Sequence, residues 1–151
     1  MYNLSEGDTV DREYDDDGID REFEEHRKKN RKYLDFFEEN LEGLSEKTRN
    51  LHLENADLFV NEFFYRYEIE DLVDGAMSLF SFFDFFNNKC LWSTPSAVKR
   101  MGATIKKFYK SMYLHGEIDD TDLELVLDIV KENLPQWIQD SEDSLSFGDD
   151  E

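Results

Sequence analysis

Five basic residues of one predicted helix have a spacing suited to binding an anion. Lys99, Lys106 and Lys110 recur at i, i+7 and i+11, so they share one stripe of a helix, and Arg100 and Lys107 share the neighbouring stripe. At about 1.5 Å per residue the first stripe spans roughly 16 Å, which is enough to contact about two or three phosphates. The spacing marks a candidate anion-binding face.

The start of the same helix adds two hydroxyl groups to this candidate site. Thr94 and Ser96 lie at the N-terminus, where the helix dipole would help a hydroxyl to bind a phosphate. Three interpretations stay open: a solvated basic face, which is the most ordinary one, a contact with acidic tails or a protein partner, and a nucleic-acid contact. In each of them the opposite side of the helix faces the core through Val98, Met101, Ile105, Phe108 and Met112.

A second, denser run of basic residues is expected to pair along its own helix. Its members are Arg27, Lys28, Lys29, Arg31 and Lys32, with acidic residues before and after them. Glu24 with Lys28 and Glu25 with Lys29 have the i, i+4 spacing of ion pairs on a helix surface. This run therefore predicts a paired, solvated surface.

The residue types that carry catalysis or bind metals are scattered. None of His26, His52 and His115 has a second histidine or a cysteine at metal-ligand spacing. His26 lies one turn from Glu22, with which we expect a surface pair. The single cysteine, Cys90, has no base beside it in the sequence and is expected to be a buried small apolar residue.

An acidic segment near the N-terminus has part of the spacing of an EF-hand loop, Glu13-x-Asp15-x-Asp17-Gly18. Its first ligand is Glu, no helix precedes it, and Asp20 stands where an aliphatic residue is required, so a solvated acidic arm is expected instead. The sequence also has no glycine-rich phosphate loop, nucleophile elbow or His-Glu-x-x-His motif. We therefore predict a protein that is not an enzyme, without a metal, a cofactor or a small-molecule substrate.

The composition limits the partners of the chain. It has 37 acidic and 17 basic residues among 151, a net charge of −20, which disfavours nonspecific contact with DNA or anionic lipid. Thirteen phenylalanines supply a substantial core. One cysteine excludes an intrachain disulfide and, with no apparent signal peptide or membrane-spanning run, favours a soluble, cytoplasmic protein.

More than half of the net charge lies at the two ends of the chain. Residues 1–18 hold seven acidic residues and one basic residue, and residues 139–151 hold six acidic residues and no basic one. Neither segment has an apolar period. We predict a disordered acidic arm over 1–18, a helical domain over 19–139 and a disordered acidic tail over 140–151.

Five helices are predicted between these ends, at about 20–40, 45–67, 69–88, 93–114 and 119–134. Gly43 and Gly116 mark helix ends, Ser45 and Thr94 with Pro95 mark starts, and Pro135 is expected to kink or end the last helix. The run 79–86 is apolar nearly all round, as in a central helix buried on several sides, although a strand is an alternative there. The fold class is all-α: one small orthogonal or bundle-like domain.

Two segments resemble a known family. Gly43-Leu44-Ser45-Glu46-Lys47-Thr48 with Leu51 and Leu58-Phe59, and Trp92-Ser93-Thr94-Pro95 leading to Phe108-Tyr109 and Gly116-Glu117-Ile118, are similar to the core-binding domain of phage-integrase-type tyrosine recombinases. The resemblance covers about residues 43–118 and implies a SAM-like helical fold. In that family the domain grips DNA with basic helix faces, while a second domain carries an Arg, a His-x-x-Arg and a nucleophilic Tyr. That catalytic pattern has no counterpart here.

Three functions follow as hypotheses. The first is a non-catalytic helical binding module that engages a protein partner or a second copy of itself, which the charge favours over DNA. The second is accessory DNA binding through Thr94, Ser96, Lys99, Arg100, Lys106, Lys107 and Lys110. The third is an acidic DNA mimic that blocks a DNA-binding protein. No membrane partner is expected.

Overall fold

The computed structural model describes residues 7–89 and 94–149, and every regular element in this part is helical. The elements are α1 (Gly7–Glu39), α2 (Glu46–Asp57), the π-helical turn η1 (Leu58–Phe63), α3 (Phe64–Arg66), α4 (Leu72–Met77), α5 (Leu79–Lys89), α6 (Pro95–Leu114) and α7 (Asp120–Asp149). The all-α class is confirmed. The strand alternative for 79–86 is wrong, because these residues lie in α5.

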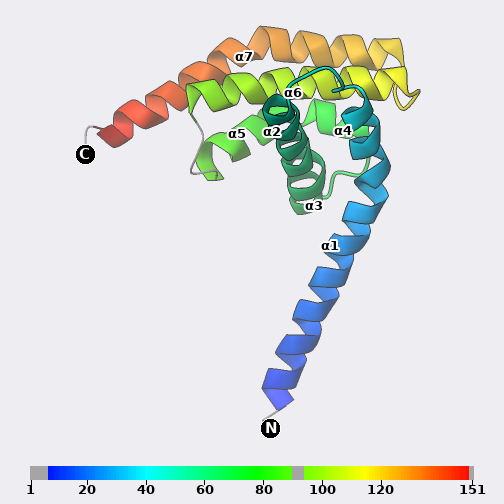
Figure 1. Cartoon of the computed structure of the whole chain (residues 1–151). Helices are drawn as coiled ribbons and strands as arrows, with labels where there is room; N and C mark the ends of the chain where they lie inside the picture. The colour runs from blue at the N-terminus through cyan, green and yellow to red at the C-terminus, as the bar shows by residue number, and fades with distance from the viewer. Residues whose placement is uncertain (1–6, 90–93, 150–151) are drawn as a thin grey trace.

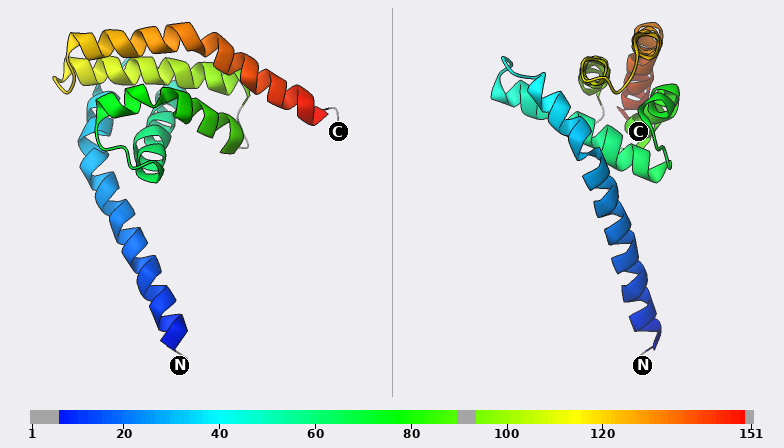
Figure 2. Two further views of the ribbon diagram at one scale, coloured as in Figure 1. Left: turned by 180° about the vertical axis from the view of Figure 1, so that it is seen from behind. Right: turned by 90° about the vertical axis from the view of Figure 1, so that its right-hand side faces the viewer.

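The helices form two layers. The long helices α6 and α7 run antiparallel and side by side, and α2 to α5 pack beneath them (Figures 1 and 2). The C-terminal half of α1 packs against α2, η1 and α6, while its N-terminal half projects away from the other helices. Because α2 crosses under α6 at a steep angle, the arrangement is orthogonal rather than a parallel bundle.

The local signals for helix ends act as predicted. The hydroxyl oxygen of Ser45 accepts a hydrogen bond from the Thr48 backbone N–H at 3.2 Å, and that of Thr94 accepts from Ala97 N–H at 3.1 Å. Gly43 and Gly116 have φ of +94° and +79°, a backbone region that glycine enters without steric cost. Ser45 and Thr94 thus cap the starts of α2 and α6, Gly116 follows the end of α6, and Gly43 lies in the turn between α1 and α2, four residues past the end of α1.

The interiors of three predicted helices differ from expectation. The helix over 45–67 contains the π-helical turn η1, and the helix over 69–88 is interrupted at Ser78, where α4 ends and α5 begins. Pro135 does not end α7, which continues to Asp149 and changes direction along its C-terminal part (Figure 2). Proline removes one backbone donor and crowds the preceding turn, so it bends the helix here without stopping it.

The two outer helices extend past the predicted domain bounds. Residues 7–18 continue α1 and residues 140–149 continue α7, so the backbone of the EF-hand-like segment is helical rather than looped. Residues 1–6 and 150–151 lie outside the described residues. Among the residues whose burial is described, the apolar core extends from Phe37 to Trp137.

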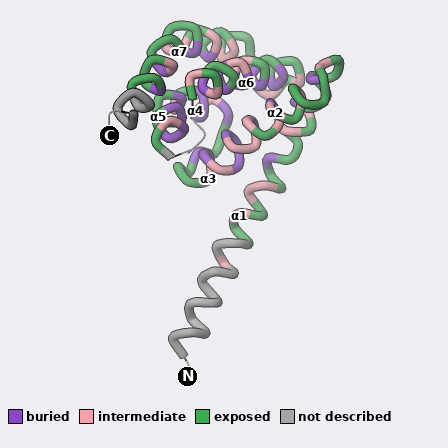
Figure 3. Tube along the Cα trace, turned by 60° about the vertical axis from the view of Figure 1, so that its left-hand side comes forward, coloured by how far each residue is buried: buried purple, intermediate pink, exposed green. Residues whose placement is uncertain are grey.

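The core is built mainly of phenylalanine. Phe59 of η1 lies 4.9 Å from Phe82 of α5 and 6.3 Å from Phe108 of α6, measured between ring centroids, and all three side chains are fully buried. Figure 3 shows the buried residues gathered where α2 to α6 meet. Helix α5 buries Leu79, Phe82, Phe83, Phe85 and Phe86, whereas Phe80 of the same apolar run is 55% exposed.

No helix in the described part of the chain combines the length and the apolar character that crossing a bilayer requires.

Candidate functional site

The α6 helix divides into a core side and a cationic side. The predicted core stripe, Val98, Met101, Ile105, Phe108 and Met112, is completely buried. On the other side Lys99, Arg100, Lys107 and Lys110 are exposed and Lys106 is half-buried. We call these five residues the cationic face. The structure therefore places all five on one exposed surface.

The cationic face has no acidic partner nearby. The helix itself contains no aspartate or glutamate. Among the residues that the structure describes, no carboxylate oxygen lies within 4.0 Å of any of the five cationic groups. Five positive charges within twelve residues repel one another, and a bound anion would relieve that repulsion.

The two hydroxyl residues at the start of α6 have different roles. The oxygen of Thr94 already caps the helix by accepting the Ala97 N–H. Ser96 is exposed, one turn before Lys99 and Arg100. Both residues lie at the N-terminal end of the cationic face, and the cap leaves the hydroxyl hydrogen of Thr94 able to donate to an anion.

The neighbouring helix carries the opposite charge. Over Asp120–Asp149, α7 has nine acidic residues and one basic residue, Lys131. The two helices approach closely at Gly102, where an added Cβ would lie 2.8 Å from Leu134 Cδ1. Opposite charges are thus segregated onto adjacent helices without direct ion pairs between them in the described region.

A buried polar group lies beneath one edge of the cationic face. His52 Nδ1 and the Asn55 side-chain amide contact the Thr104 hydroxyl oxygen at 2.7 Å and 3.1 Å, and this oxygen lies 3.0 Å from the Arg100 carbonyl oxygen. Burial lowers the pKa of His52, and the positive charges of Lys107 and Arg100 lower it further. Both effects favour the neutral imidazole, which joins α2 to α6 through Thr104.

The basic run of α1 pairs with other elements rather than along its own helix. The side chains of Arg27, Lys29 and Lys32 lie 3.8, 4.0 and 3.6 Å from carboxylates of Asp57, Glu70 and Glu117, respectively. Neither of the predicted pairs, Glu24–Lys28 and Glu25–Lys29, forms an ion pair in the described structure. The prediction was wrong about the partners, because packing of α1 brings acidic residues from distant parts of the sequence closer. Such exposed pairs contribute little stability.

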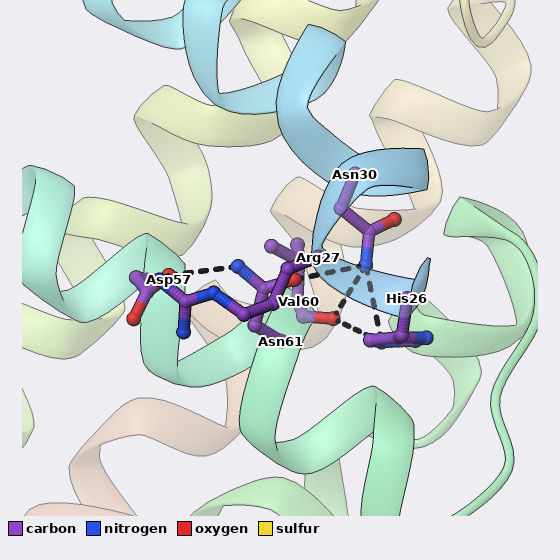
Figure 4. A network of polar contacts seen from close by, with 6 residues as sticks. All are labelled: His26, Arg27, Asn30, Asp57, Val60 and Asn61. Carbon is purple, nitrogen blue, oxygen red and sulfur yellow. Dashed lines mark hydrogen bonds and ion pairs between the residues drawn. The ribbon is translucent and has the colours of Figure 1, made fainter. Parts of the chain in front are cut away.

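A buried polar network joins α1 to η1 (Figure 4). The carbonyl oxygen of Val60 accepts hydrogen bonds from His26 Nε2 and from Asn30 Nδ2, each at 2.9 Å. Asn30 Nδ2 also lies 3.2 Å from Asn61 Oδ1, and Asn61 Nδ2 donates to Asp57 Oδ1 at 2.7 Å. The surface pair predicted between His26 and Glu22 is therefore wrong, because His26 turns inward to Val60.

The chemistry of this network is structural. A carbonyl oxygen can only accept, so Nε2 of His26 carries the hydrogen and cannot also accept from Asn30, 3.1 Å away. Both side chains thus share Val60 O as their acceptor. Although π-helical turns are frequent at functional sites, the hydrogen bonds here are used to hold α1 against η1.

The remaining candidate groups do not assemble into a reactive site. His115 stacks on Phe36 with ring centroids 4.0 Å apart and lies 3.8 Å from Glu39 Oε1. Cys90 lies outside the described residues. Within the described region, no group of three or more histidine, cysteine, aspartate or glutamate side chains is arranged to hold a metal ion.

No protein-family model, curated protein or solved structure matches this chain.

Proposed function

We propose that this chain is a non-catalytic helical binding module whose contact surface is the cationic face of α6. The observation that carries the proposal is the set of five basic side chains on one exposed helix face with no carboxylate within 4.0 Å in the described structure. In a chain with more than twice as many acidic as basic residues, so concentrated a cationic face suits an anionic partner.

A protein partner is favoured over DNA. Duplex DNA carries one charge per about 1.7 Å of its axis, and the nine acidic residues of α7, which packs beside α6, would repel it. An acidic protein segment is narrower and can lie along α6 alone. The resemblance of residues 43–118 to a recombinase core-binding domain supports contact through a basic helix face, and it keeps DNA as the alternative partner.

The test compares two probes and two matched variants. Fluorescence anisotropy measures binding of a glutamate-rich peptide and of a short DNA duplex at the same ionic strength. The first variant, Lys99→Glu/Lys106→Glu/Lys110→Glu, reverses the charge of the stripe. The second reverses three exposed cations elsewhere, Lys28, Arg31 and Lys131, and so changes the net charge equally.

We expect the α6 variant to lose at least about tenfold in peptide affinity, or about 1.4 kcal/mol, while the control variant binds as the unmodified chain does. Equal losses in the two variants would show that only net charge matters. Tighter binding of the duplex than of the peptide, lost in the α6 variant alone, would replace the proposed protein partner with DNA.

A further inference from the structure

A groove between α5 and α7, on the other side of the core from α1, combines aromatic and acidic side chains. It is lined by Phe80, Asp84, Asn87, Asn88, Trp137 and Asp140 and has a volume of about 300 Å³. Its α5 residues recur at i, i+4, i+7 and i+8 and thus share one face of that helix. The volume is at the small end of ligand sites and suits one side chain better than a whole cofactor.

The aromatic part of the groove is held from one side and open on the other. Trp137, only 5% exposed, stacks on Phe83 with ring centroids 4.2 Å apart and planes at 7°. Phe80 meets Trp137 edge-on at 5.5 Å and 79°, yet remains 55% exposed. The Phe80 ring is therefore fixed in place and can offer its electron-rich face to a cation.

Two oriented carboxylates stand beside this ring. Asp84 Oδ1 accepts from the Asn88 side-chain amide, and Asp140 Oδ1 accepts from that of Gln136, each at 2.9 Å. Both aspartates are exposed, and neither has a basic group within 4.0 Å among the described residues. The second oxygen of each carboxylate remains able to accept from a ligand.

Two other acidic hollows lack this combination: the hollow lined by Asp120, Thr121, Leu123, Glu124 and Leu127 has no aromatic ring. The cleft of Asp35, Glu38, Glu39 and Glu42 already contains a cation, Arg49, and has no aromatic ring in its lining. Negative charge alone therefore does not distinguish the α5–α7 groove. Its distinguishing feature is an exposed phenyl ring that lines the same groove as two carboxylates.

We propose that the α5–α7 groove binds a guanidinium group, presented by an arginine of a partner protein segment. A guanidinium is planar and can stack on Phe80 while its N–H groups donate to Asp84 and Asp140, whereas an ammonium group has no flat surface to stack. This site is separate from the cationic face of α6, and its occupation does not depend on the function proposed for that face.

The test uses NMR of the full-length chain, with the indole N–H resonance of Trp137 assigned through Trp92→Phe. The probes are the capped tripeptide Gly-Arg-Gly and its citrulline counterpart, a neutral group of nearly the same shape. The variants are Asp84→Asn/Asp140→Asn, Phe80→Leu and, as a control, Glu38→Gln/Glu42→Gln in the other acidic cleft. The variants at Asp84, Asp140 and Phe80 and the control at Glu38 and Glu42 alter exposed side chains.

We expect the arginine peptide to shift the Trp137 resonance in a saturable way, with a dissociation constant of about millimolar. The citrulline peptide should leave the resonance in place, Asp84→Asn/Asp140→Asn and Phe80→Leu should each weaken binding about tenfold, and the control should match the unmodified chain. No saturable shift, equal shifts with citrulline, or an equal loss in the control variant would overturn the assignment.

Discussion

The side-chain amide of Asn30 donates a 2.9 Å hydrogen bond to the carbonyl oxygen of Val60, which fastens α1 to the π-helical turn η1. Asn30 is 2% exposed, and the same amide lies 3.2 Å from Asn61 Oδ1. One side chain thus satisfies two acceptors that water does not reach. The orientation of α1 on the core depends on this contact more than on the exposed ion pairs nearby.

Replacing Asn30 tests how much its hydrogen bonds contribute to the stability of the fold. Asn30→Ala should lower the free energy of unfolding by about 1–3 kcal/mol, because Asn61 Oδ1 loses a partner and Val60 O keeps only His26. Urea unfolding followed by circular dichroism measures the loss. The same change at exposed Asn50 of α2 should stay within about 0.5 kcal/mol. Equal effects at the two positions would assign the network no special role.

Two glycines should respond to alanine with opposite signs. At Gly75 of α4 an added Cβ would lie 2.6 Å from Phe64 Cε1 and 3.0 Å from the Tyr109 hydroxyl oxygen. Gly75→Ala should therefore destabilise by about 1–3 kcal/mol. At Gly18 of α1 the nearest described atom is 4.0 Å away, so Gly18→Ala should stabilise by up to about 1 kcal/mol through helix propensity. A neutral Gly75→Ala in thermal unfolding would contradict this packing.

His52 predicts a loss of stability in mild acid. Its pKa in the folded state is lowered by burial first and by Lys107 and Arg100 next, so the unfolded chain binds the proton more readily. The contribution of His52 is fully present above its unfolded pKa of about 6.5 and is lost as the pH falls through the lower folded value. In His52→Gln, the free energy of unfolding measured with urea should therefore decline less as the pH is lowered from 7.

The cause of that shift can be checked directly. Lys107→Gln removes one of the two positive charges and should raise the pKa of His52 in an NMR titration of its ring protons. Lys28→Gln neutralises a lysine that is not among the charges acting on His52, so it should leave the pKa of His52 unchanged. An unchanged pKa in Lys107→Gln would mean that Lys107 does not contribute to the shift.

Tyr109 predicts the opposite dependence at high pH. Its hydroxyl donates to the Leu72 carbonyl oxygen at 2.6 Å, and burial, helped by Asp71 and Tyr33, raises its pKa well above 10. The unfolded chain ionises near pH 10, so the stability due to this residue is lost as the pH rises above that value. Tyr109→Phe should lower the free energy of unfolding by about 1 kcal/mol at neutral pH and reduce its further loss at alkaline pH. Absorbance follows the ionisation of tyrosine, and urea unfolding at each pH measures the stability.

Local chemistry explains which parts of the fold could be predicted. Ser45, Thr94 and Gly116 act on backbone groups within a few residues of themselves, so their positions sufficed to place helix ends. The interruption at Ser78 and the π-helical turn depend on packing between distant helices. The sequence predicts that Pro135 kinks or ends the last helix; the kink is the outcome, and Trp137, two residues later, is buried in the continuing helix.

The sequence contains a signal for the buried polar networks that the predictions did not use. His26 and Asn30 lie at i−11 and i−7 from the buried Phe37, and His52 lies seven residues before the buried Phe59, so all three fall in the register of the core. A polar residue in such a register implies a buried partner. Identifying that partner required the fold, because Val60 and Thr104 come from other helices.

The two candidate binding surfaces were predictable to different extents. Spacing alone placed Lys99, Lys106 and Lys110 together, but only the fold shows that no acidic side chain reaches them among the described residues. The α5–α7 groove could not be predicted, because a run as apolar as 79–86 is typical of a fully buried helix. Phe80 remains 55% exposed although its ring meets Trp137 of α7 edge-on.

The segregation of charge between α6 and α7 has a consequence for molecular encounters. A cationic helix lying beside an anionic one gives the protein a transverse electric dipole, so an approaching charged molecule experiences a torque before any side chain touches it. At physiological ionic strength the field decays over about 8 Å, and the torque acts only in the last stage of approach. Adding salt should therefore slow productive association more than it speeds dissociation.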